Sequence, residues 1–187
     1  YDGLSHPVLG ADHFLAMVCV GIVSAQIGGR AIWIVPSTFV LIMIIGGIIG
    51  MSVEINKGLQ DQAISVSETE MVYYLADYIY MIIEIGIILS VIFLGLTIAI
   101  EKKLSMYLIM IFVGIFGFCH GTAHGLEIPW ASNPILFALG FALGTAALHL
   151  FGVGIGHFSL KTFFSSILLR IFGILCAVYG SYLIFQL

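Results

Sequence analysis

Residues 71–100 read MVYYLADYIYMIIEIGIILSVIFLGLTIAI, a largely apolar run that contains only two charged residues. About 20 apolar residues are enough to cross the hydrocarbon core of a bilayer as a helix. A lipid-embedded run of this length must be helical, because a helix satisfies its backbone hydrogen bonds within the segment. The stretch therefore predicts a transmembrane helix.

Five more stretches of comparable length and apolar character lie on either side of it, at about 7–27, 31–53, 104–126, 134–157 and 163–186. They occupy most of the chain, so we expect one domain over residues 1–187, a polytopic all-α bundle of six transmembrane helices. The connection 54–70 (EINKGLQDQAISVSETE) is acidic. We expect it to be a surface loop with little structure.

The composition agrees with a protein whose solvent is the lipid bilayer. Hydrophobic residues make up 61% of the chain and charged residues 9%, whereas about a quarter of the residues of a soluble domain are charged. A soluble enzyme is excluded on this ground. A nucleic-acid binder is excluded as well, because six scattered Lys and Arg residues form no basic patch.

The few cations predict the orientation of the bundle. Arg30, Lys102, Lys103 and Lys161 lie in alternate connections, which the positive-inside rule places in the cytoplasm. Both termini then face outward. The chain starts at Tyr1 without Met, which is consistent with a cleaved secretory signal peptide or with an expression artefact.

Glycines recur at four-residue spacing within several of these stretches, a pattern that lets helix backbones approach closely in lipid. The pairs and triplets are 46/50, 117/121/125, 140/144 and 152/156. We expect close packing at these positions, which would bring side chains of different helices within reach of one ion.

The first unexpected polar cluster is CHGTAHGLEIP at 119–129. His120, His124 and Glu127 fall within about 40° of one another on a helix. Two imidazoles at this spacing can bind one metal ion, and the carboxylate can ligate the ion or orient a ligand. Ionisable groups at membrane depth are costly and indicate function by default.

The second cluster is HPVLGADH at 6–13. His6 and His13 would share a face of a regular helix but lie about 10 Å apart along it, so they can share an ion only if the chain near Pro7 and Gly10 is unwound. Asp12 either ligates from another side or fixes an imidazole tautomer. One site and two successive sites both remain open.

The predicted topology places both clusters in the outer part of the membrane, so we expect them to meet. Glu84 lies near the middle of 71–100, and we expect it to be the next station inward on a cation route. A hydrogen bond of a protonated Glu84 to Ser90 or Thr97 is the alternative. We expect His149 to be a packing residue.

At these residues the sequence resembles the HupE/UreJ family of nickel permeases. The chain matches the family's patterns with HPVLGADHFLAMVCVG at 6–21 and HGTAHGLEIP at 120–129, and it shares EIGIILSVIFLGL from Glu84 and AALHLFGVG around His149. The resemblance covers essentially the whole chain. The long acidic connection 54–70 departs from the family's pattern but touches none of these motifs.

The resemblance implies nickel uptake across the bacterial cytoplasmic membrane for hydrogenase or urease maturation, with Co²⁺ a further substrate in some relatives. It also implies a cleaved signal peptide, no catalytic cofactor, and a set of metal-handling residues. These are His6, Asp12, His13, Glu84, His120, His124 and Glu127.

Two other functions use the same residues. An intramembrane zinc-dependent hydrolase would hold a metal-bound water with the His/Asp cluster, and a haem-b electron carrier could use His13 and His124 as axial ligands. Imidazole with carboxylate suits nickel, cobalt and zinc alike. No ATP-binding motif is present in the sequence, so a permease here would act by facilitated diffusion or secondary transport.

Overall fold

The structure is a computed structural model. It describes residues 3–4, 8, 10–60, 66–101, 104–127 and 133–187. For 55–60, 66–76 and Glu127 it describes the course of the helix and not the side chains.

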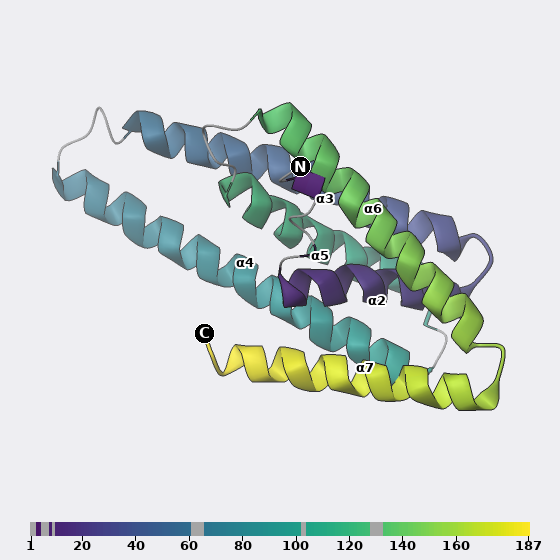
Figure 1. Ribbon diagram of the computed structural model, residues 1–187. Coiled ribbons are helices and arrows are strands. Elements are labelled where there is room, and N and C mark those ends of the chain that lie inside the picture. The colour runs from purple at the N-terminus through teal and green to yellow at the C-terminus, as the bar shows by residue number, and fades with distance from the viewer. Residues whose placement is uncertain (1–2, 5–7, 9, 61–65, 102–103, 128–132) are drawn as a thin grey trace.

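The described chain folds into a bundle of helices, as the hydropathy pattern predicts (Figure 1). The helices are α2 (Ala11–Ile27), α3 (Ala31–Gln60), α4 (Val66–Ile100), α5 (Met106–Glu127), α6 (Pro134–Ser159) and α7 (Phe163–Ile184). Five of them, α3 to α7, are long and apolar enough to cross a membrane. The all-α prediction is confirmed, and the count of six spans is confirmed for five.

The sixth expected span, 7–27, is only partly a spanning helix. α2 has 17 residues and is about 26 Å long at 1.5 Å per residue, less than the hydrocarbon core of about 30 Å. It begins after Gly10, whose backbone is extended (φ −91°, ψ 120°). Figure 1 shows that α2 starts inside the bundle, partway along the neighbouring long helices and not level with their ends.

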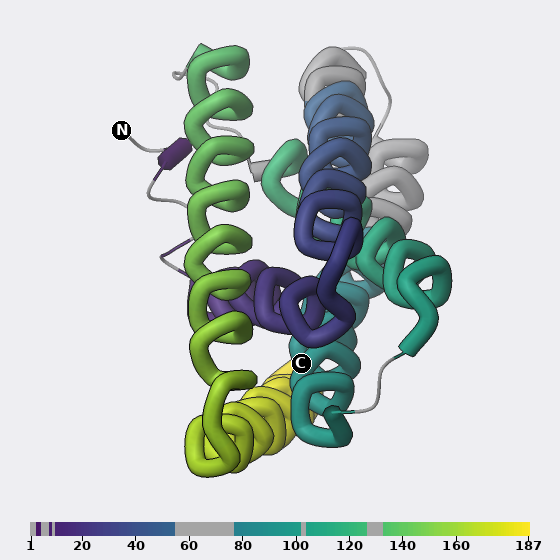
Figure 2. Tube along the Cα trace, turned by 90° about the vertical axis from the view of Figure 1, so that its right-hand side faces the viewer, coloured from purple at the N-terminus to yellow at the C-terminus, as the bar shows by residue number. Residues whose placement is uncertain are grey.

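α2 is the central helix. It packs against each of the other five helices, and every residue from Ala16 to Ala25 is buried. Figure 2 shows it in the middle of the bundle, with α6 on one side and α3 on the other. An all-round apolar surface is typical of a helix enclosed by protein.

The expectation of a loop at 54–70 is wrong at both of its ends. α3 continues to Gln60 and α4 begins at Val66, while 61–65 lie outside the described residues. The 30 residues of α3 extend about 45 Å, longer than the bilayer core. Charged and amide side chains such as Glu and Gln are good helix formers in water, so the helices continue beyond the lipid.

Glycines allow the closest helix pairs to form, as their spacing predicts. On α3 and α5, a Cβ added at Gly121 would collide with the carbonyl oxygen of Met43, and one at Gly50 with that of Thr122. The same holds for Gly21 against α6 and for Gly95 against α7. The pairs α3/α5, α4/α7 and α2/α6 are the most extensive in the bundle.

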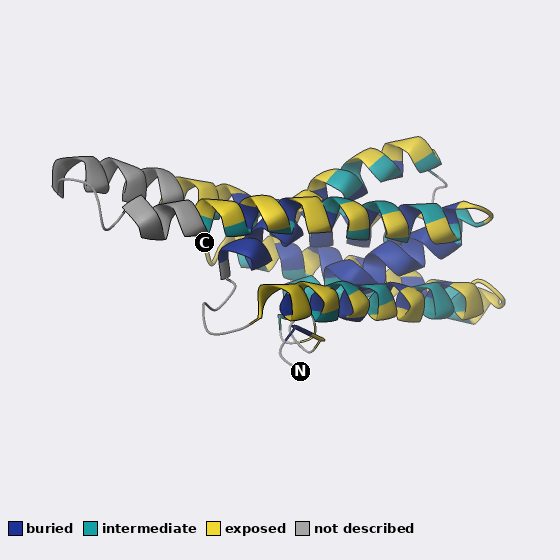
Figure 3. Ribbon diagram, turned by 90° about the horizontal axis from the view of Figure 1, so that it is seen from above, coloured by how far each residue is buried: buried dark blue, intermediate teal, exposed yellow. Residues whose placement is uncertain are grey.

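The cation-bearing connections share one end of the bundle. Figure 1 places the α2–α3 turn with Arg30, the α4–α5 connection and the α6–α7 turn with Lys161 at that end. Arg170 of α7 donates from Nε to the carbonyl oxygen of Ala99 (3.0 Å). Large apolar side chains on the outward faces of the long helices are exposed (Figure 3), as lipid contact requires.

Candidate metal centre

The start of α2 positions an imidazole with a carboxylate beside it. His13 Nδ1 and Asp12 Oδ1 lie 3.1 Å apart, and since the carboxylate can only accept, the imidazole donates. Asp12 is in the first turn of α2, where the helix dipole favours a negative charge. Of the two roles expected for Asp12, the geometry has it fixing the tautomer of His13, so that Nε2 carries the lone pair.

His120 on α5 is held in the same tautomer by a different acceptor. Its Nδ1 donates to the carbonyl oxygen of Phe116, one turn earlier (2.8 Å), and the residue is fully buried. The Nε2 atoms of both His13 and His120 are buried and have no hydrogen-bond partner among the described residues. A ring fixed through one nitrogen, with the other nitrogen free to accept, is typical of a metal ligand.

The two sequence clusters meet in the structure. The ring centroid of His13 lies 5.0 Å from that of His120 and 4.7 Å from that of His124. These three residues are called the three-histidine cluster below. α2 begins directly after the extended backbone at Gly10, and its first turn carries His13 to the end of α5. The expectation that the two clusters lie together is confirmed for His13, His120 and His124.

The rings stand close together without yet surrounding one point. In the part of the chain that the structure describes, no group of three or more His, Cys, Asp or Glu side chains is arranged to hold a metal ion. Metal–nitrogen distances are about 2.1 Å, so the rings must turn for their nitrogens to converge on one ion.

Aromatic residues enclose the three-histidine cluster, and the sequence analysis did not single them out. Phe39 of α3 lies 5.3 Å from His120, and Phe141 of α6 lies 4.1 Å from His124 (ring centroids). A phenylalanine in an apolar helix is ordinary core by pattern, so no sequence signal distinguishes these two. They pack against the His120 and His124 rings.

Glu84 lies at the same level of the bundle as the three-histidine cluster and not further inward. A Cβ at Gly86 of α4 would touch Cys119 of α5 (2.5 Å from Sγ), and Ile83 belongs to the same buried cluster as Ala123. Because α4 and α5 are antiparallel, Glu84 is level with the turn between His120 and His124. The expected inward position is wrong, while a role in handling the metal stays a prediction.

The alternative hydrogen-bond partners for Glu84 donate to the backbone of α4 itself, and their oxygens can still accept. Ser90 donates its hydroxyl proton to the carbonyl oxygen of Ile87 (2.6 Å), and Thr97 donates to that of Phe93 (2.8 Å). Glu84 is half-buried. Two further predicted ligands are not placed: His6 lies outside the described residues, and so does the side chain of Glu127, the last residue of α5.

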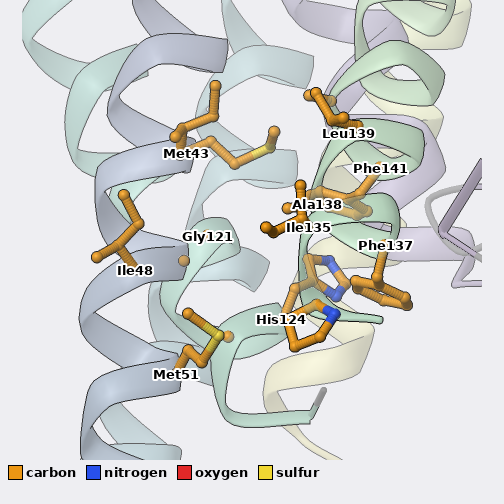
Figure 4. Close-up of a pocket in the computed structure, with 15 residues that line it drawn as sticks. Met43, Ile48, Met51, Gly121, His124, Ile135, Phe137, Ala138, Leu139 and Phe141 are labelled. Atoms are coloured by element: carbon orange, nitrogen blue, oxygen red, sulfur yellow. The ribbon is translucent and has the colours of Figure 1, made fainter. Parts of the chain in front are cut away.

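An apolar cavity of about 300 Å³ opens between α3, α5 and α6 beside the cluster. Among the described residues that line it, His124 has the only polar side chain, and Met51, Ile135 and Phe137 lie around that ring (Figure 4). Ile48 and Leu139 on its rim are exposed. A cation would find no replacement for its hydration shell here, so this cavity suits lipid chains better than an ion.

Two comparisons with known proteins find relatives of this chain. The HupE / UreJ protein family matches residues 1–76 and 69–183. The chain is also 39% identical, over 153 residues, to "Protein HupE" of Rhizobium leguminosarum bv. viciae, covering 82% of this chain and 68% of that protein. The chain belongs to the HupE/UreJ family. No solved structure matches it.

The HupE/UreJ family is associated with nickel and cobalt transport, and it is a transporter-type family. The membership confirms the resemblance read from residues 6–21 and 120–129. With the five long apolar helices, it makes this chain a multi-pass membrane protein of a nickel-transport family.

Proposed function

We propose that this HupE/UreJ chain is a permease that takes up Ni²⁺, with Co²⁺ as a second substrate, across the bacterial cytoplasmic membrane. The observation that carries the proposal is the three-histidine cluster, in which the Nε2 atoms of His13 and His120 are buried, oriented and without a partner among the described residues. The end of the bundle with Arg30 and Lys161 then faces the cytoplasm, and the N-terminus lies outside. The nickel supplies hydrogenase or urease maturation.

In this mechanism the ion exchanges its waters for protein ligands in steps. His6 and Glu127, whose side chains lie outside the described part of the chain, receive the hydrated ion first in this proposal. His13, His120 and His124 then replace further waters. Asp12 and the Phe116 carbonyl keep two of these rings in the ligating tautomer, and the carboxylate raises the basicity of its imidazole.

Glu84 supplies charge compensation in this scheme. A divalent ion among neutral imidazoles in a low-dielectric interior needs nearby negative charge. Asp12 stands next to His13, and Glu84 is level with the cluster on α4. The two carboxylates together balance one Ni²⁺.

The membrane potential is a sufficient driving force. A divalent cation moving inward gains about 4.6 kcal/mol per 100 mV, twice the value for one charge. Transport also requires that binding be weak enough for release. A cluster that must rotate its rings to bind fits this requirement better than a complete ligand cage.

The zinc-dependent hydrolase that the sequence left open is not favoured. The family is of the transporter type, and the described residues that line the cavity beside His124 include no second polar side chain that could bind a scissile group. We therefore propose no catalytic role and no catalytic cofactor for the cluster.

Uptake of radioactive nickel tests the proposal. Cells that express the chain should accumulate Ni²⁺ faster than cells without it, and His13→Ala should return uptake to the background because the centre loses one of its oriented ligands. His157→Ala is the matched control, because His157 is an exposed histidine near the C-terminal end of α6 and not part of the cluster. Equal uptake by wild type and His13→Ala would contradict the proposal.

A further inference from the structure

His149 of α6 is a buried histidine that the nickel-binding cluster does not include. It is 1% exposed, and neither ring nitrogen has a hydrogen-bond partner among the described residues. Buried polar side chains are satisfied in the great majority of cases, so an exception needs an explanation. The packing role expected from the sequence leaves both nitrogens unexplained, because an apolar residue would pack equally well without the desolvation cost.

The position of His149 continues the line of the three-histidine cluster toward the cation-bearing end of the bundle. A Cβ added at Gly21 of α2 would collide with the carbonyl oxygen of His149, which sets His149 at the level of Gly21. Gly21 follows His13 by about 12 Å along α2. His149 therefore lies inward of the cluster in the proposed orientation.

One phenyl ring separates His149 from the cluster. The centroid of Phe39 lies 5.1 Å from the ring of His149, nearly perpendicular to it at 89°, and 5.3 Å from the ring of His120. The same side chain thus contacts both histidines.

A cavity with additional polar groups lies at His149. Its volume is about 370 Å³, and it is lined by the first turns of α3, from Ile32 to Leu41, and by Ala146, His149 and Leu150 of α6. Ser37 contributes a hydroxyl to the lining. Pro36, inside α3, has no N–H to donate to the carbonyl oxygen of Ile32, so this oxygen lacks its usual helical partner.

We propose that His149 is a second binding station for the transported divalent transition-metal ion, inward of the three-histidine cluster and separated from it by Phe39. This inference rests on the proposed function. An imidazole nitrogen with a hydroxyl, a freed carbonyl and water is a weaker ligand set than three imidazoles. A weak inner site after a stronger outer one lets the ion leave toward the cytoplasm, since conduction requires several sites that each release their ion.

Uptake of Ni²⁺ by the purified full chain in proteoliposomes that contain a nickel-sensitive dye tests the station. Two variants separate metal binding from packing: His149→Phe fills the space without a ligand atom, and His149→Cys is smaller but can bind the metal. We expect His149→Phe to slow uptake about tenfold or more and His149→Cys to retain about a third of it. A packing role predicts the reverse order.

The matched control is His157→Phe, on the same helix but exposed, which should leave uptake within about twofold of wild type. Equilibrium binding of Ni²⁺ to the three-histidine cluster should fall by much less than the roughly tenfold expected at the least for a lost partner of the metal centre in all these variants, because His149 is not one of the three ligands. Wild-type uptake by His149→Phe, or loss of cluster binding in that variant, would overturn the inner station. If His13→Ala still abolishes uptake in that case, the proposed function stands; if the wild type takes up no Ni²⁺, both fall.

Discussion

The three-histidine cluster and His149 place the same side chain at two depths of one bundle, in different settings. In the cluster, His13 and His120 each donate a hydrogen bond from Nδ1 to a fixed acceptor. The Nε2 atom of each ring is left to accept or to bind a metal ion. His149 has neither a fixed acceptor nor a neighbouring histidine ring among the described residues. From this difference we expect the oriented rings of the cluster to bind the metal more tightly than His149 does.

The largest expected effect is a difference in Ni²⁺ affinity between a variant of the cluster and a variant of His149. His120→Ala should weaken Ni²⁺ binding to the purified protein by about 100-fold, because a buried and oriented ligand is lost. His149→Ala should leave this first binding event within about twofold of wild type. Isothermal titration calorimetry in detergent measures both, and equal losses in the two variants would remove the distinction between the regions.

The next effect concerns the acceptor that orients His13. Asp12→Asn keeps the size of the side chain but removes the carboxylate charge, so His13 becomes a less basic ligand and its ring is held less firmly. We expect Ni²⁺ affinity to fall by about 10- to 100-fold, the range for the loss of such an outer partner. Asp77→Asn, an exposed carboxylate on α4, is the control in the same titration and should bind like wild type. Unchanged affinity in Asp12→Asn would mean that the carboxylate does not prepare the ring.

The smallest effect comes from Gly10, over which the Asp12–His13 pair folds. A Cβ at this position would lie 3.0 Å from Asp12 Oδ1 and 3.1 Å from His13 Nδ1, so Gly10→Ala must displace the pair by a few tenths of an ångström. The extended backbone at Gly10 accepts alanine, and the helix is not strained. We expect Ni²⁺ affinity to fall about fivefold without a change in thermal stability in detergent. A matching loss of stability would point to folding as the cause.

The sequence was sufficient to predict most of the fold because hydropathy reports directly on the bilayer. The five long helices follow from this signal, and close glycine contacts follow from the four-residue spacing of the glycines. It could not predict the short α2, because Pro7 suits the first turn of a helix and the pattern therefore favours a start at residue 7 and not after Gly10. The helical ends of 54–70 were missed for the opposite reason: they are polar, and polar residues outside the lipid can still be helical.

The centre was predictable in part. The loop charges placed the His13 and His120 segments at one depth, and the structure brings these residues together. The level of Glu84 depends on how α4 is aligned with α5, which is set by the contact of Gly86 with Cys119 and leaves no trace in hydropathy. Phe39 carries no signal because its type is common in any apolar helix.

The most direct test of the account is the position of the bound ion. Crystals of the protein grown with Ni²⁺ and measured at the nickel absorption edge would show it as an anomalous peak. The account predicts a peak about 2.1 Å from the Nε2 atoms of His13 and His120, with the His124 ring turned toward it. A peak away from all three rings would contradict the claim that this cluster is where the permease binds its metal.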